Sequence, residues 1–508
     1  MGSTLRLAVA GLLLAATAAP VLAAPSALIK CDGYGRRQTP GEQVGRGILI
    51  LGTLGLFGSA EADQPSARLK GDEAIAACTE ALTDSRTTGN PVRRAEVLLM
   101  RGARQFEMGR FEEAIADARL ARTVELTPLV RAHFDRNIGP ATLMLEAFVR
   151  LSQNNQAEAE KLAFVAANAR PNATFLTEEA LRIMQLTPEI SSEEQQLLHR
   201  LWLLMPNVRP ATHMEGAGDW KGSAASLKQL IAMLSKPGVV TLSRHAAVQA
   251  LAGDTAGAEA TLARVGQDID ELAAKAGGTD QAAQTAAQQV ARADELVQLA
   301  RAQIALNKGQ VEEAKGFLAG RPRWLSPPSL TAAIIANVQA KGGPGTAPGV
   351  DPAKIRADAT KVARDGLTGK GVLSLATVML PRWEEPDVAQ EFGKVMLPTS
   401  KLMQPKPVRD GVATGITSAR QASIDTATEA LLVAAARATA AKGQDRFAVL
   451  LHFPLPSVAR VGLASRLSMI EFVTPADPLF AAQESRAIKV ADVEAALGSQ
   501  YRAPLPQR

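Results

Sequence analysis

The chain has 508 residues, of which 46% are hydrophobic, 21% are charged and 4% are aromatic, and its formal net charge is +5. This balance excludes a disordered chain, and the length exceeds what one hydrophobic core usually serves. Basic and acidic residues alternate along the chain without a block of five basic residues, so no nucleic-acid-binding face is indicated. We expect two or three domains or a repeat array, built mainly from helices because the apolar residues are mostly aliphatic.

Residues 1–23 have the pattern of a secretory signal peptide. Arg6 precedes an apolar run over 7–19, and Val21 and Ala23 lie three and one positions before the expected cut. Such a segment is removed on export and is too short to remain as a membrane span. The sequence therefore predicts a periplasmic or secreted protein with no integral membrane span after signal removal.

Cys31 and Cys78 are the only cysteines in the chain. In an oxidising compartment an isolated pair indicates one disulfide, which would stabilise the fold by roughly 4 kcal/mol; two unrelated buried thiols are the alternative. Between them, residues 48–57 are apolar and glycine-containing, and form either a buried segment stapled by the disulfide or an exposed docking patch.

Helical spacing of apolar residues begins at Gly71, and residues 95–128 show its clearest pattern. Two expected helices flank a turn at 108–111, and small residues occupy Gly102, Ala114 and Ala121. Antiparallel helices approach closely only where side chains are small. The segment resembles a tetratricopeptide repeat.

Further copies of this pattern follow along the chain. Residues 140–172 carry small residues at the same offsets, and the turn recurs near Gly218, Gly253 and Gly309. The small positions of these copies are Ala147, Ala159, Ala166, Ala246, Ala258, Val265, Ala302 and Ala314. The resemblance covers about 71–318, and residues 273–293 are read as an extended helix or a long insertion between helices.

The resemblance implies an α-solenoid whose concave groove holds a peptide or a partner surface. In the clearest copy the groove would be lined by Leu99, Ala103 and Phe106. The co-chaperone branch of the family grips a peptide carboxylate with Lys and Asn at the positions that Leu99 and Ala103 occupy, so that activity is not implied. An apolar or mixed groove is expected, with packing between repeats as the alternative role of Leu99 and Phe106.

The remaining residues are expected to form a second, different module. Residues 341–352 are read as a Gly- and Pro-rich linker, and residues 353–508 as a C-terminal helical and α+β module. Within that module we expect helices at 352–366, 424–442 and 490–497, and paired strands at 446–453 and 467–473. The predicted division is thus 24–92 as a disulfide-stapled segment with a capping helix, 93–340 as the repeat array, then the linker and the module.

No residue pattern in the chain indicates catalysis. The five histidines lack metal-ligand spacing, and no nucleophile elbow, phosphate loop or dinucleotide fingerprint occurs. Adjacent acidic pairs, such as Glu193 and Glu194, point in different directions on a helix. We therefore predict neither a metal, a cofactor nor an enzyme activity.

The leading hypothesis is an exported, non-catalytic scaffold that binds a peptide or protein partner through the repeat groove. One alternative is a structural or assembly factor of the cell envelope that docks through residues 48–57. A second alternative is a hydrolase hidden in the C-terminal module.

Overall fold

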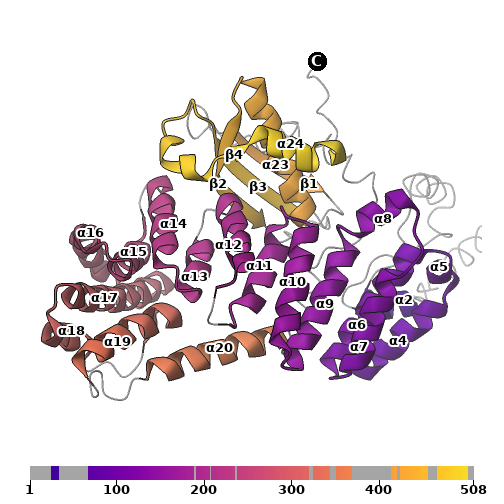
Figure 1. Cartoon of the computed structure of the whole chain (residues 1–508), viewed down its shortest axis with the longest axis horizontal. Helices are drawn as coiled ribbons and strands as arrows, with labels where there is room; N and C mark the ends of the chain where they lie inside the picture. Colours follow the sequence, from indigo (N-terminus) through magenta and orange to yellow (C-terminus); the bar gives the residue numbers. More distant parts are fainter. Residues whose placement is uncertain are drawn as a thin grey trace, which may run out of the picture. The chain divides into compact units, whose positions relative to one another are not determined.

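A computed structural model of the chain shows a mainly helical fold with a small sheet (Figure 1). It describes residues 25–33, 67–187, 190–205, 208–234, 237–319, 324–343, 351–368, 413–419, 424–455 and 466–501. The predicted signal peptide, the apolar stretch 48–57 and most of the predicted linker lie outside these residues. Across the described helices, none is both long and apolar enough to cross a membrane.

The chain divides into two compact units, residues 1–125 and 126–508. The division falls within the last residues of the first predicted repeat, after its second helix, whereas the predicted boundary lay between residues 92 and 93. The first unit contains α2 (Ala27–Asp32), α4 (Gly71–Thr83), α5 (Ser85–Thr88), α6 (Pro91–Glu107) and α7 (Phe111–Arg122).

Two links hold the six-residue helix α2 in the first unit. The predicted disulfide between Cys31 and Cys78 joins α2 to α4, which confirms that pairing. Beside it, the Arg93 guanidinium of α6 donates to both carboxylate oxygens of Asp32, at 2.5 and 3.0 Å. Both side chains are buried, and the carboxylates of Asp32 and Glu96 raise the pKa of Arg93 against the opposing effect of its burial. A helix this short has little stability of its own, so these links fix its position.

Most helices of the second unit pack against the next helix along the chain. They are α8 (Pro128–Phe134), α9 (Ile138–Ser152), α10 (Gln156–Ala169), α11 (Thr174–Met184), α12 (Ser192–Leu204), α13 (Val208–Gly216), α14 (Trp220–Met233), α15 (Val239–Leu251), α16 (Thr255–Lys275), α17 (Gln281–Asn307), α18 (Val311–Leu318), α19 (Pro328–Gly342) and α20 (Pro352–Thr368). Residues 273–293 prove to be the end of α16, a short connection and the start of α17.

One three-residue turn recurs at five helix–helix connections, at 108–110, 153–155, 217–219, 252–254 and 308–310. The middle residue has a positive φ in each, with values of 74°, 60°, 74°, 87° and 79°. The N–H of the third residue donates to the carbonyl five residues earlier, at 2.8 to 2.9 Å, which is the Schellman arrangement. Glycine occupies the middle position in four copies because it adopts positive φ without strain, and Asn154 occupies it in the fifth. The predicted turns near Gly109, Gly218, Gly253 and Gly309 are confirmed.

Small residues are buried at fixed distances from these turns. Seven residues before the middle turn residue stand Ala147, Ala211, Ala246 and Ala302, and five residues after it stand Ala114, Ala159, Ser223, Ala258 and Ala314, all with 0% exposure. Gly102 holds the first position in the earliest copy and is also buried. The predicted small positions are therefore interior ones, and Ala211 with Ser223 adds a pair that the sequence analysis did not assign.

The C-terminal part of the second unit contains a four-stranded sheet of order β1-β3-β2-β4. Its strands are β1 (Ala413–Ala419), β2 (Arg446–Leu455), β3 (Arg466–Val473) and β4 (Ile488–Lys489). All three pairings are antiparallel, and β2 has a bulge between Val449 and Leu451. The predicted pairing of the two strands at 446–453 and 467–473 is confirmed, whereas β1 was not predicted.

Helices cover this sheet and complete its core. They are α23 (Ile424–Ala441), η2 (Ala481–Arg486), α24 (Val490–Leu497) and η3 (Gly498–Gln500), and α23 packs against β1, β2 and β3. The rings of Phe447 and Phe472 meet edge to face with centroids 5.6 Å apart. The predicted helices at 352–366, 424–442 and 490–497 correspond to α20, α23 and α24 and are confirmed.

Replacing Gly253 with alanine should lower the free energy of unfolding by roughly 1–2 kcal/mol, because a Cβ is strained at positive φ even though no atom lies near it. Gly266 is a matched control, since it lies exposed within α16 with equally open surroundings. Gly266→Ala should raise the free energy of unfolding by roughly 0.5–1 kcal/mol through helix propensity. Urea titrations followed by circular dichroism measure both, and changes of the same sign would contradict the turn assignment.

Candidate functional site

The three predicted groove residues lie on α6 in the first unit. Ala103 and Phe106 are 2% and 4% exposed, and the ring of Phe106 lies 6.0 Å from that of Phe111, measured between centroids. Leu99 is half-buried and offers part of its side chain to solvent. Nothing in the surroundings of these three residues marks them as a binding site, so their role in a groove stays a prediction. Leu99 is partly exposed, so a substitution there can test that role.

Glu429 of α23 is the centre of a buried ion network in the second unit. Its carboxylate accepts hydrogen bonds from Arg170 at 2.9 and 3.2 Å and from Arg136 at 3.0 Å. The hydroxyl of Tyr501 donates to the same carboxylate at 3.0 Å, and Arg170 also donates to Asn137 at 3.1 Å. Burial by itself would raise the pKa of Glu429, but the charges and hydrogen bonds of its partners lower that pKa below its ordinary value. The carboxylate is therefore held ionised and fully engaged, as a structural link between α23 and the helices around α8 to α11.

Arg486 forms a second link, between η2 and α12. It is 0% exposed and donates to the carbonyls of Trp202 and Leu203 at 2.8 and 3.0 Å. These carbonyls lie at the C-terminal end of α12, where the helix dipole favours a cation. A third hydrogen bond, at 2.9 Å, goes to Gln483. Burial lowers the pKa of Arg486 to about 9. Its hydrogen bonds to the two carbonyls make the side chain a cap for the C-terminal end of α12.

Glu194 is a buried acid whose pKa is raised well above its ordinary value. It stands in the first turn of α12 with 1% exposure, and its Oε1 atom has no hydrogen-bond partner. Burial raises the pKa of Glu194 to about 7, the nearby charge of Glu160 adds to the rise, and a hydrogen bond from Gln185 opposes it. A carboxyl group in this state exchanges its proton near neutral pH.

Polar side chains from three other helices or their ends lie around this acid. Glu160 of α10 accepts from Gln156 at 2.7 Å and from the hydroxyl of Thr187. Gln185, which follows α11, donates to the carbonyl of His213 at 2.8 Å, and its Oε1 lies 2.8 Å from His213 Nδ1. We call Glu160, Gln185, Glu194 and His213 the acid centre. Within this group, the carboxyl of Glu194 can bind or release a proton near neutral pH.

The sequence predicts that the adjacent Glu193 and Glu194 point in different directions on a helix, and the structure agrees, since Glu193 is exposed and Glu194 is buried. The burial of Glu194 itself was not predicted. The burial of Glu194 could have been predicted from its spacing, which places it on the same helical face as the apolar residues of α12. Glu194, Leu197, Leu198 and Leu201 are all buried and follow one helical face, whereas Glu193 is exposed. A carboxylate on an apolar stripe predicts a buried acid.

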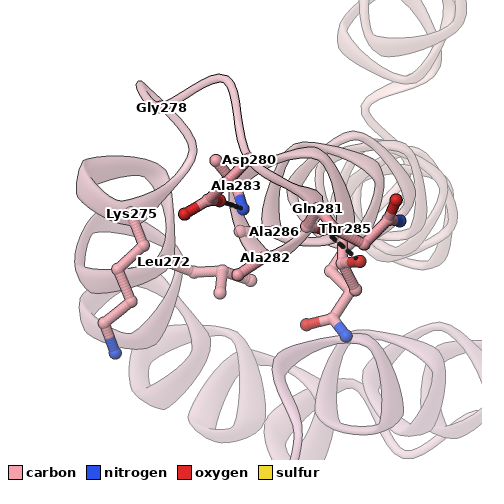
Figure 2. Close-up of a pocket in the computed structure, with 10 residues that line it drawn as sticks. Leu272, Lys275, Gly278, Asp280, Gln281, Ala282, Ala283, Thr285 and Ala286 are labelled. Atoms are coloured by element: carbon pink, nitrogen blue, oxygen red, sulfur yellow. Dashed lines mark hydrogen bonds between the residues drawn. The ribbon is translucent and has the colours of Figure 1, made fainter.

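An open hollow of about 800 Å³ lies where α16 is connected to α17 (Figure 2). Leu272, Lys275, Ala282 and Ala286 contribute to its lining. Two polar groups beside it already serve the helix: Asp280 accepts from the Ala283 N–H at 2.7 Å as the cap of α17, and the Thr285 hydroxyl donates to the Gln281 carbonyl at 2.8 Å. The hollow therefore offers alanine methyl groups and capping atoms rather than convergent ligand groups.

The histidines are spread over separate places in the fold. His213 and His245 are buried, His199 is exposed near Trp202, and the side chains of His133 and His452 lie outside the description. Burial lowers the pKa of His245 to about 4, which leaves it neutral at neutral pH. Among the side chains that the structure places, no group of three or more His, Cys, Asp or Glu residues could hold a metal ion.

No protein-family model, no curated protein and no solved structure gives a significant match to the chain.

Glu194→Gln should stabilise the protein more at about pH 8 than at about pH 5. The folded-state pKa of Glu194 lies above its unfolded value, so stability from the bound proton is complete below the unfolded pKa and is lost as the pH rises through about 7. Glutamine keeps the neutral form at every pH and removes this loss. Thermal unfolding across that pH range measures the effect, with exposed Glu193→Gln as the matched control. A pH-independent difference between Glu194→Gln and the wild type would refute the buried-acid assignment.

Glu429→Gln should lower the free energy of unfolding by roughly 3–5 kcal/mol, because it leaves two arginines without their counter-charge in a buried site. The control is Glu494→Gln, which removes the partner of Arg437 where both side chains are partly exposed, and should cost about 0–1 kcal/mol. Urea unfolding at neutral pH compares them. Similar losses for the two variants would mean that the Glu429 network is not a structural link.

Proposed function

We propose that the chain is an exported, non-catalytic scaffold that binds a peptide or protein partner through one face of a helical-repeat array. The observation that carries the proposal is the fivefold recurrence of one turn, with buried small residues at the same offsets from it. A helix pair of this kind cannot bury its apolar face alone, so successive pairs stack and present a continuous surface.

In this proposal the five turns join antiparallel helix pairs of the tetratricopeptide kind, one in the first unit and four that stack as an α-solenoid in the second. The pairs are α6–α7, α9–α10, α13–α14, α15–α16 and α17–α18. Packing between first helices supports the stacking, since α15 contacts α17 and α17 contacts α19 in addition to their own partners. The shared apolar core of α13 to α19 supports it as well.

Export to the periplasm or the outside of the cell is also part of the proposal. The signal-like residues 1–23 suggest it, and the disulfide of the first unit supports it because such bonds persist in oxidising compartments. The proposed partner is a peptide or protein, with no cofactor and no nucleic acid.

A random-sequence peptide library displayed on phage tests the groove. The mature chain from Ala24 onward should select peptides, and Leu99→Glu should weaken binding of the selected peptides by roughly tenfold or more, since a charge then faces an apolar or mixed surface. Leu120→Glu is the matched control, because Leu120 lies on α7 of the same pair and is exposed. Circular dichroism must first show equal helicity. Failure to select any peptide, or equal binding by both variants, would defeat the proposal.

A further inference from the structure

Helix α20 connects two parts of the second unit that lie far apart in the sequence. Near its start, Ile355 packs against the apolar core that α13 to α19 share. Toward its other end it contacts α9 and α11. Figure 1 shows α20 running from α19 to the region beside α9 and α10. The chain thus leaves α9, passes through α10 to α19, and returns along α20.

Arg364 attaches the second end of α20 to the turn between α9 and α10. Its Nη1 atom donates to the Leu151 carbonyl at 3.5 Å and to Asn154 Oδ1 at 3.3 Å, and its Nη2 atom donates to Gln156 Oε1 at 3.3 Å. These are long hydrogen bonds, of the kind that contribute modestly. Leu367, three residues further along α20, is 1% exposed.

The identity of Asn154 fits this attachment. The other four copies of the turn have glycine at the middle position, which has no side chain to accept a hydrogen bond. Asparagine tolerates the positive φ and supplies an amide oxygen. The copy of the turn that α20 reaches is thus the copy that carries an acceptor for Arg364.

Between its two attachments α20 has little contact with the rest of the unit. Of its 17 residues, Pro352 and Leu367 are the buried ones, and Val362 is 71% exposed. A helix with few buried apolar contacts opens locally at a lower free energy than the core around it. Whether α20 stays in place therefore depends on its two ends.

We propose that α20 is a releasable strap, anchored in the core beside α19 and latched at its other end to the α9–α10 turn by Arg364. While latched, the strap fixes the separation between α9 and α19. Its regulatory consequence rests on the proposed function, because the helices between α9 and α19 would form the binding face and their curvature would set its fit. Release of the latch lets that curvature change.

Hydrogen exchange of the full mature chain, read by mass spectrometry, tests the latch. Arg364→Ala should speed exchange across residues 360–368 by roughly tenfold or more, while α19 and α9 exchange as in the wild type. Lys361→Ala is the matched control, since Lys361 lies exposed one turn earlier on the same helix, and it should exchange as the wild type does. Unchanged exchange in Arg364→Ala would overturn the proposal, and so would a rise throughout α9 to α19, because Arg364 would then be a core residue.

Spin labels then test the effect on the array. Cysteines at Lys161 on α10 and Lys341 on α19 replace exposed residues, and the native cysteines are already paired. Arg364→Ala should broaden or shift the distance distribution between the labels, and an unchanged narrow distribution would overturn the strap. No ligand enters either measurement, so failure of the strap is distinguishable from failure of the peptide-binding proposal, which the Leu99 variant decides.

Discussion

The buried carboxylate of Glu429 constrains how the second unit can be assembled. An ionised group without partners would cost several kcal/mol in the interior, so α23 has to lie where Arg170 and Arg136 reach it. Glu429 and Arg170 are 259 residues apart, so the network joins the C-terminal sheet and its helices to the earlier helices of the unit. Arg486 imposes a similar constraint at the end of α12. The predicted C-terminal module is therefore part of the same compact unit as α8 to α20 rather than a separate body.

Local features of the fold were predictable because their causes are local. Positive φ at Gly109, Gly218, Gly253 and Gly309 follows from glycine between two helical patterns, and two apolar runs separated by a proline-containing break predicted β2 and β3. The partners of Glu429 and Glu194 were not predictable, since nothing near either residue indicates which distant side chain will meet it. Strand β1 escaped prediction because its small and polar residues gain their extended form by pairing with β3.

The buried carboxylates differ in how completely their oxygens are hydrogen-bonded and in the direction in which their pKa is shifted. Glu429 has a lowered pKa and engages Arg136, Arg170 and Tyr501, and Glu215 engages both Arg244 and Ser223. Charged groups that are fully engaged with one another rigidify a structure and are poor proton carriers. Glu194 is different, because one of its oxygens has no partner and its pKa lies near neutrality. Its ionisation would place an unpaired charge in the interior among helices α10 to α13, which is why the stability of the protein is predicted to depend on pH through this residue.

Gln156 physically connects this acid centre to the strap. Its amide nitrogen donates to Glu160, whose charge raises the pKa of Glu194, and its amide oxygen accepts from Arg364 of α20. Ionisation of Glu194 adds a negative charge near that of Glu160, and the like charges disfavour the ionised form of Glu194. Movement of Gln156 would remove one of the three acceptors of Arg364. The acid centre and the attachment of α20 therefore share the Gln156 side chain, through its amide nitrogen on one side and its amide oxygen on the other.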